Sequence, residues 1–337
     1  MILEDRIIAF EYLRDYLLLL SQKPQFKILC QRAYENNNWF TKDSINYSLL
    51  SICSMIKGDS LRKFVASYKI NDNRPKKVGV VVPSNLPFVG FYDFLCVLLS
   101  GNIYVGKLSK NNNIFIPFIS DILIKHQPDF KKYIYMVDDF ESIDVLIATG
   151  SNLTARYFKY KYASTTKIIR KNRVSVGVLN GLENTNDFEK IACDSYSYFG
   201  LGCRSISKIF IPRYFNLKSL KDTFSSFLSI NDNANYMDNY NYQKSLFILN
   251  NIEFIDFDNL LLIESSDMHS PISVLYYQYY DDLDVLNEFL VNQSDQIQCI
   301  VSNDSGVNNA IHFGQAQKPT LFDFPDGVDV VKFLISS

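Results

Sequence analysis

The 337-residue chain has no large excess of charge of either sign, since 34 Lys and Arg face 36 Asp and Glu and the formal net charge is −2. No block of basic residues stands out, so nucleic acid is not expected as a partner. No apolar run reaches the length that spans a bilayer, so we expect no membrane span. The partly apolar N-terminal stretch is interrupted by Glu11, Arg14 and Asp15. That pattern indicates an amphipathic helix and not a targeting segment.

Cysteine and histidine are few and scattered. The six cysteines form no Cys-x-x-Cys pair, and the three histidines lie far apart in the sequence. This spacing argues against a metal site. An even number of cysteines in so long a chain does not suggest a disulfide framework, so we expect reduced thiols and a cytoplasmic protein.

The Gly-x-Gly-x-x-Gly pattern is also absent. An ordinary Rossmann dinucleotide turn is therefore not supported. No internal repeat is visible, which leaves the alternation of helices and strands as the main guide to the fold.

The length and the 47% of hydrophobic residues predict a large core and two domains. Residues 1–70 have apolar positions at helical spacing. From Lys77 onward, short apolar runs alternate with helical stretches, which predicts parallel sheets. The expected strands are residues 78–82, 103–105, 145–148, 174–179, 206–211, 260–264, 272–277 and 297–301. Residues 231–243 have no period and predict a surface loop, and residues 313–337 predict an ordered extended return.

Two polar side chains follow predicted strands directly. Asn85 lies in Pro83-Ser84-Asn85-Leu86-Pro87, and Lys107 follows the next strand. Ligands of parallel α/β sheets bind beyond the carboxyl ends of the strands, so both residues are candidates for a site. The alternative is that Asn85 is a turn residue before a proline and that Lys107 is a solvated surface lysine.

A third strand leads into Thr149-Gly150-Ser151-Asn152 and then into a helical stretch. Glycine and serine at such a turn expose the first N–H groups of the helix, which suit a phosphate. The alternative is a common turn with a helix cap.

Cys203 lies between a helical stretch and a strand, just after Gly200 and Gly202 and just before Arg204. Glycines let backbone and ligand approach a site closely. Arg204 and nearby N–H groups would favour the thiolate, which is the reactive form of cysteine. The alternative is a small buried residue, the commonest role of an unpaired cysteine.

These pieces, in this order, resemble the acyl-CoA reductase family related to the fatty-acid reductase of bacterial bioluminescence, within the aldehyde dehydrogenase superfamily. The resemblance covers roughly residues 75–335. Its segments are Pro83-Ser84-Asn85-Leu86-Pro87 with Gly101-Asn102 and Lys107, Ala148-Thr149-Gly150-Ser151, Tyr198-Phe199-Gly200-Leu201-Gly202-Cys203-Arg204, Ser270-Pro271, Gly314-Gln315-Ala316-Gln317 and Asp326-Gly327-Val328-Asp329. The Cys203 and Thr149-Gly150-Ser151 motifs are the most specific.

The resemblance implies an α/β fold with a helical N-terminal region and two parallel-sheet domains. We expect a cofactor-binding domain at residues 1–174 and a catalytic domain at 175–337, with the site in the cleft between them. A homo-oligomer is also implied.

The resemblance also implies roles for single residues. Cys203 would be the nucleophile, and the Asn85 amide would stabilise the oxyanion together with the Cys203 N–H. Gly150 and Ser151, after Thr149, would lie beside the cofactor pyrophosphate. Lys107 would contact the adenosine ribose and favour NADPH, with NADH as the alternative. Asp267 falls near the acidic residue that holds the nicotinamide ribose, although that residue is usually Glu in the family.

One departure from the superfamily is informative. Aldehyde dehydrogenases that form free acids carry a glutamate base in Glu-Leu-Gly-Gly, where this chain has Val178-Leu179-Asn180-Gly181. Without a carboxylate there, water is not readily activated to hydrolyse a thioester. The resemblance then implies attack of Cys203 on an acyl-CoA, with coenzyme A leaving, and reduction of the enzyme thioester to an aldehyde.

Three hypotheses follow from the sequence. The first is an NADPH-dependent reductase of long-chain acyl-CoA. The second is a reductase that takes its acyl group from a partner acyl-activating or acyl-transfer protein. The third, a non-catalytic subunit that binds acyl thioesters, is disfavoured because Cys203, Asn85 and Gly150 are all present.

Overall fold

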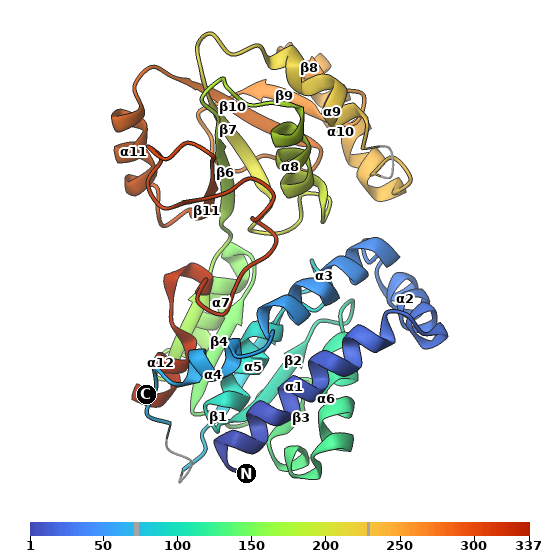
Figure 1. Cartoon of the computed structure of the whole chain (residues 1–337), viewed down its shortest axis with the longest axis vertical. Helices are drawn as coiled ribbons and strands as arrows, with labels where there is room; N and C mark the ends of the chain where they lie inside the picture. The colour runs from blue at the N-terminus through green and yellow to red at the C-terminus, as the bar shows by residue number, and fades with distance from the viewer. Residues whose placement is uncertain (71–73, 228–229) are drawn as a thin grey trace. The chain divides into compact units, whose positions relative to one another are not determined.

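The computed structural model describes residues 1–70, 74–227 and 230–337, which form two compact units (Figure 1). The first unit comprises Met1–Asn172 and Lys318–Ser337, and the second comprises Arg173–Gln317. The last 20 residues therefore pack in the first unit, whereas the sequence-based division placed them in the second domain, residues 175–337. The assignment of cofactor and catalytic roles to the two units stays a prediction.

The N-terminal region of the first unit is helical, as predicted. Its helices are α1 (Leu3–Leu20), α2 (Pro24–Asn36), α3 (Lys42–Met55) and α4 (Ser60–Val65). None of the helices in the described part of the chain is long and apolar enough to cross a membrane.

The sheet of the first unit is entirely parallel, with strand order β3-β2-β1-β4-β5. Its strands are β1 (Lys77–Val82), β2 (Ile103–Leu108), β3 (Ile134–Met136), β4 (Val145–Thr149) and β5 (Thr166–Arg170). The helices that accompany them are α5 (Phe91–Leu99), α6 (Phe115–His126) and α7 (Asn152–Lys161), with a 3₁₀ turn η1 (Pro128–Lys132). Strands covered on both faces become continuous apolar runs, which is why β1 and β4 could be predicted from sequence.

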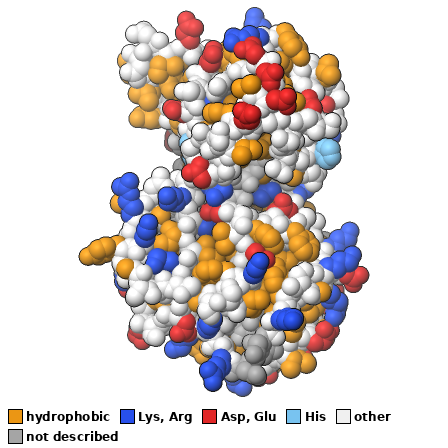
Figure 2. Space-filling view, turned by 90° about the vertical axis from the view of Figure 1, so that its left-hand side faces the viewer, with side chains coloured by type: hydrophobic (Ala, Val, Ile, Leu, Met, Phe, Trp, Pro, Cys, Tyr) orange, Lys and Arg blue, Asp and Glu red, His pale blue; other side chains and the backbone are white. Residues whose placement is uncertain are grey.

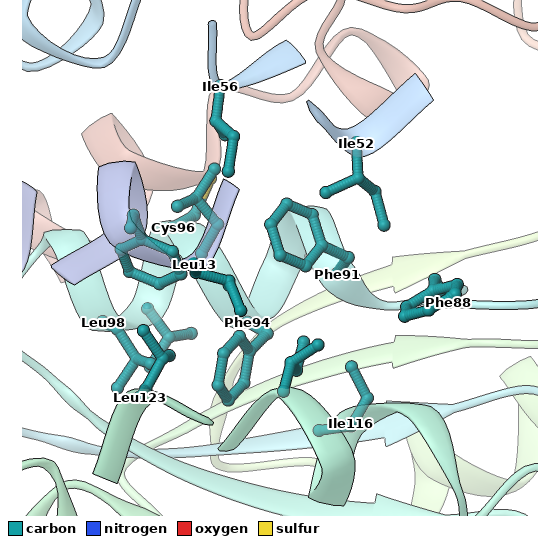
Figure 3. Packing of buried hydrophobic residues seen from close by; sticks show 14 of the residues in the cluster. Leu13, Ile52, Ile56, Phe88, Phe91, Phe94, Cys96, Leu98, Ile116 and Leu123 are labelled. Carbon is teal, nitrogen blue, oxygen red and sulfur yellow. The ribbon is translucent and has the colours of Figure 1, made fainter. Parts of the chain in front are cut away.

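The core of this unit is built around α5, nearly every residue of which is buried. Figure 3 shows Phe91 and Phe94 of α5 packed among side chains of the neighbouring helices, including Leu13 and Ile116. The ring of Phe10 meets both edge-on, with centroid distances of 6.4 Å to Phe91 and 6.3 Å to Phe94. This aromatic packing fixes the helix that follows the Asn85 loop.

The sequence predicts an extended C-terminal segment. The structure shows instead that this segment contains the 3₁₀ turn η4 (Pro325–Gly327) and the helix α12 (Val330–Ser336). Asp329 caps α12 by accepting a hydrogen bond from the Lys332 N–H, and Val330, Val331 and Leu334 are buried. The prediction was wrong because this helix is short and owes its stability to packing, which leaves little periodic signal.

The sheet of the second unit has strand order β12-β11-β6-β7-β10-β9-β8. It is mixed, because β8 and β9 pair antiparallel while the other pairs are parallel. Its strands are β6 (Val174–Val178), β7 (Ile206–Pro212), β8 (Ile255–Asp256), β9 (Leu261–Glu264), β10 (Val274–Tyr280), β11 (Ile297–Val301) and β12 (Ala310–Ile311). Its helices are α8 (Thr185–Tyr196), α9 (Lys221–Ser225) preceded by η2 (Leu217–Leu220), α10 (Ala234–Leu249) and α11 (Leu283–Asn292). The predicted α/β class with a helical N-terminal region is confirmed.

The loop predicted for residues 231–243 is wrong, because most of this stretch belongs to α10. Asn233 caps the helix by accepting from the Tyr236 N–H. Tyr236, Tyr240 and Phe247 are its buried side chains, and the Tyr236 hydroxyl donates to the Asn259 carbonyl at 2.8 Å. Asn and Tyr are weak helix formers, so burial of the aromatic rings decides the structure here.

Charged side chains of both signs are interspersed with hydrophobic ones on the face drawn in Figure 2. This agrees with the near-neutral composition.

Candidate active site

Three of the predicted site residues share the carboxyl edge of the first sheet. β1 lies between β2 and β4, and Val81 of β1 pairs with both Lys107 and Ala148. Lys107 and Thr149 therefore flank the loop that carries Asn85. The sequence predicts that Lys107 follows its strand. In the structure Lys107 lies within β2, which continues to Leu108.

The loop around Asn85 is held by side chains from outside it, which donate hydrogen bonds to four of its backbone carbonyls. These bonds run from Asn112 Nδ2 to Pro83 O (3.0 Å) and Leu86 O (3.3 Å), from Asn37 Nδ2 to Ser84 O (2.9 Å), and from Ser48 Oγ to Pro87 O (2.8 Å). Asn37 lies between α2 and α3, and Ser48 lies on α3. The N-terminal helices thus position the Asn85 loop, a role that the sequence did not reveal.

The turn after β4 has the geometry of a phosphate-binding helix start. Ser151 caps α7 by accepting from the Thr154 N–H at 3.2 Å. A Cβ atom on Gly150 would lie 2.8 Å from Thr154 Cγ2, so any other residue would force the Thr154 side chain to shift. Residues 151–153 are exposed, so the first N–H groups of the helix can be reached by an anion.

A cluster of opposite charges surrounds Lys107. Its Nζ lies 3.1 Å from Asp139 Oδ1, and Lys161 Nζ lies 2.8 Å from Asp139 Oδ2. The hydrogen bonds from Lys161 and Lys107 hold the pKa of Asp139 well below its usual range. Lys161 Nζ also lies 5.7 Å and 5.5 Å from the ring centroids of Tyr157 and Tyr162. One carboxylate therefore holds two lysines that could otherwise meet an anionic ligand.

A buried ion pair lies close to the same edge of the sheet. Arg170, at the end of β5, binds both carboxylate oxygens of Asp93 of α5 through Nη1 and Nη2, at 2.5 Å and 2.8 Å. Burial lowers the pKa of Arg170, but the Asp93 carboxylate outweighs this effect and raises it above its ordinary value. Arg170 Nη1 also donates to Thr149 Oγ1 at 3.4 Å, so the pair supports the turn before Gly150. Sequence reasoning missed both residues, which are 77 positions apart.

Cys203 lies in the second unit, in the loop between α8 and β7. Of the six cysteines, all of which the structure describes, only Cys203 is exposed. Phe199 and Gly200 have φ of 58° and 76°, so the turn that follows α8 contains two left-handed residues, a conformation that glycine favours. The structure thus presents the predicted nucleophile to solvent, and the alternative of a buried core cysteine is wrong.

The Cys203 loop is fixed on both sides by hydrogen bonds. Ser175 Oγ donates to the Cys203 carbonyl at 3.0 Å, and Arg204 Nε donates to the Ala316 carbonyl. Gln317 Nε2 lies 3.2 Å from Ser205 Oγ and 3.2 Å from the Asp194 carbonyl. The segment Gly314-Gln315-Ala316-Gln317, far away in the sequence, therefore supports the loop. Such support restrains the backbone around Cys203.

A cavity of about 50 Å³ lies beneath this loop, within the second unit. It is lined by residues of the loop, including Phe199, Gly202 and Ser205, and by Tyr236 and Ser270. A space of this size holds one or a few small polar groups or waters.

Asp267 lies on the loop between β9 and β10, and it is exposed. Its N–H donates to Ser265 Oγ at 3.1 Å. The structure thus places Cys203 and Asp267 in the second unit, and Asn85, Lys107, Thr149, Gly150 and Ser151 in the first.

Comparison with known proteins identifies a family and a fold. The family model described as acyl-CoA reductase (LuxC) matches residues 9–231. Among curated proteins, none matches the chain significantly.

Solved structures of aldehyde dehydrogenases are similar over most of the chain. Aldehyde dehydrogenase 21 from Physcomitrella patens, in complex with its product succinate, has a TM-score of 0.68 at 11% identity and covers 100% of this chain and 84% of its own. An NAD-dependent aldehyde dehydrogenase from Sinorhizobium meliloti has a TM-score of 0.66 at 12% identity, covering 93% and 74%. An acetylating aldehyde dehydrogenase from Geobacillus thermoglucosidasius has a TM-score of 0.63 at 11% identity, covering 95% and 86%. At such identities the likeness shows the fold alone.

Proposed function

The chain belongs to the acyl-CoA reductase (LuxC) family, and from this premise we propose that it reduces an acyl-CoA thioester to an aldehyde with NADPH through a thioester on Cys203. The resemblance found in the sequence is confirmed by the family match and by the aldehyde dehydrogenase fold. The chain is thus an oxidoreductase of acyl groups. The observation that carries the proposal is an exposed Cys203 in a loop fixed by hydrogen bonds.

In this mechanism the Cys203 thiolate attacks the carbonyl carbon of the thioester. A bond forms between that carbon and Cys203 Sγ, and the bond to the coenzyme A sulfur breaks, so that coenzyme A leaves as a thiolate. The negative charge that develops on the oxygen would be stabilised by the Cys203 N–H and the Asn85 amide. The rigid support of both loops suits this task, because such donors must be oriented before the reaction.

A nicotinamide cofactor would bind through the exposed N-terminus of α7, with Gly150 and Ser151 beside the pyrophosphate and Thr149 just before them. Lys107 would contact the adenosine ribose, and Asp267 the nicotinamide ribose. The chain fits such a group, since the turn at Gly150 packs closely on Thr154 and leaves the helix start exposed. When bound, the cofactor supplies the hydride that reduces the acyl group to the aldehyde level.

Protection of the thioester from water is part of the proposal. Val178, which stands where acid-forming aldehyde dehydrogenases have glutamate, is buried and carries no carboxylate. Two residues later, the Asn180 side chain donates to Asp304 at 3.0 Å. The nearby Glu183 accepts from the N–H groups of Asn180 and Gly181, at 2.7 Å and 3.0 Å. Its carboxylate is thus engaged in the turn, so release of the acyl group as an aldehyde is favoured over hydrolysis.

The direct test is consumption of NADPH in the presence of acyl-CoA esters from short to long chain, with the aldehyde identified by mass spectrometry. We expect NADPH loss to match aldehyde formation and release of free coenzyme A. If aldehyde forms only when a partner protein supplies the acyl group, the substrate is that protein-bound acyl group and not acyl-CoA. Formation of the free acid would contradict the proposal.

The charge cluster around Lys107 predicts how the cofactor preference can be changed. Replacing Asp139 with asparagine releases both lysines from the carboxylate, so NADPH, with its 2′-phosphate, should bind roughly tenfold more tightly relative to NADH. Dissociation constants of both cofactors, measured by fluorescence titration at one ionic strength, check this.

Asp129→Asn is the matched control, because Asp129 is also exposed and pairs with a lysine, Lys132, at 3.4 Å. It should leave the preference unchanged. Equal changes for NADH and NADPH in Asp139→Asn would show that these lysines do not meet the 2′-phosphate.

A further inference from the structure

A lysine is fully buried at the centre of the second sheet. Lys208, five residues after Cys203, lies on β7, between β6 and β10, where it pairs with Val176 and Tyr276. Burial of an ammonium group costs free energy unless its N–H donors form hydrogen bonds. The groups that accept these hydrogen bonds therefore indicate the role of the lysine.

All three donors of Lys208 are engaged by oxygens. Nζ lies 2.8 Å from the Ser265 carbonyl, 3.1 Å from the Asp267 carbonyl and 2.6 Å from Gln278 Oε1. Burial lowers the pKa of Lys208 to about 8, while the charge of Asp267 acts in the opposite direction. The side chain therefore ties the end of β9 to the middle of the sheet.

The preceding residue fixes the other half of the same loop. Ser207 Oγ donates to the Met268 carbonyl at 2.9 Å and accepts from the Ser270 N–H at 2.6 Å. The adjacent residues Ser207 and Lys208 therefore both bind this loop. Residues 265–270 are thus held at four backbone groups by one dipeptide.

We propose that Lys208 is a positioning residue for the nicotinamide cofactor, which fixes the backbone on both sides of residue 266 so that the exposed Asp267 carboxylate is presented to the ribose. This inference rests on the proposed function, in which Asp267 contacts the nicotinamide ribose. An aspartate is one methylene shorter than the glutamate usual in the family, so its backbone must be placed more closely. A backbone that is already ordered loses less entropy when the ligand binds.

A merely structural role for Lys208 makes a different prediction. Replacement would then lower the stability of the second unit and impair acylation of Cys203 and cofactor binding together. A positioning role predicts that replacement impairs cofactor binding and leaves acylation of Cys203 intact, because only the cofactor needs the 265–270 loop.

The experiment measures the two half-reactions separately in Lys208→Met and Lys208→Arg. Acylation of Cys203 by acyl-CoA without cofactor is followed by intact-protein mass spectrometry, and NADPH binding by fluorescence titration. In Lys208→Met we expect the dissociation constant of NADPH to rise roughly tenfold or more, with acylation within about twofold of wild type. Lys208→Arg keeps a charged donor, so its dissociation constant for NADPH should lie between those of wild type and Lys208→Met.

An unchanged NADPH affinity in a folded Lys208→Met protein, or an equal loss in both half-reactions, would overturn the inference. If Lys208→Met does not fold, Ser207→Ala decides instead, since it removes only the second anchor. It too should weaken NADPH binding and spare acylation, and unchanged NADPH affinity there would overturn the inference. Failure of wild-type protein to bind NADPH or NADH would instead refute the proposed function.

Discussion

Cys203→Ala is expected to lower aldehyde formation from acyl-CoA on the order of a thousandfold or more, because the variant has no group that can take the acyl chain from coenzyme A. The acyl adduct that wild type forms in the absence of cofactor should disappear from the intact mass. NADPH binding should persist, since the residues assigned to the cofactor are unchanged. Turnover, adduct mass and NADPH titration are measured on the same preparations.

Cys30→Ala is the matched control for the adduct. Cys30 is buried on α2, and burial raises the pKa of its thiol to about 11. A thiol so protonated at neutral pH is inert, so this variant should keep both turnover and adduct. An adduct that persists in Cys203→Ala, or one that is lost in Cys30→Ala, would show that another cysteine is the nucleophile.

The parts of the site that could be predicted are those that lie next to a strong local signal. Asn85 and the Thr149-Gly150-Ser151 turn follow apolar runs that are typical of buried parallel strands, and the glycines before Cys203 follow the end of a helix. Each of these residues is located by its own neighbours in the sequence. This is why the edge of the first sheet and the cysteine loop could be predicted before the structure.

The parts that could not be predicted depend on contacts between distant segments. Asn37 and Asn112 hold the Asn85 loop through hydrogen bonds that span 47 and 29 positions, and neither residue has a pattern that marks it. Lys208 follows the strand pattern, but its burial depends on the carbonyls of a loop more than 50 residues later. The periodicity of the sequence indicates which face of a helix or strand is buried, but it does not indicate which polar group from a distant segment packs against that face.

These missed residues share one task. Asn112, Ser175 and Lys208 each donate to main-chain carbonyls of a loop that carries a candidate site residue. Hydrogen bonds to the backbone leave the functional side chain itself available. In the proposed mechanism, loops held in this way would supply the fixed dipoles that transition-state stabilisation requires.

The largest effect on stability is expected at the ion pair between Asp93 and Arg170. Replacing Asp93 with leucine leaves the Arg170 guanidinium buried without its carboxylate, and should lower the free energy of unfolding of the first unit by about 3–5 kcal/mol. The double variant Asp93→Leu/Arg170→Met replaces both charges with apolar groups and should recover most of this loss.

The chain offers a reporter for this unit alone. Trp39 is the single tryptophan of the sequence and packs against the core of the first unit, so its fluorescence during urea denaturation follows that unit. Arg62→Met is the control, because Arg62 and Glu4 form an exposed pair in the same unit, and such pairs contribute little. A double variant as unstable as Asp93→Leu would mean that the site needs this charge pair for its packing. A stable double variant with weakened NADPH binding would instead assign the pair to the turn at Thr149, which Arg170 Nη1 contacts.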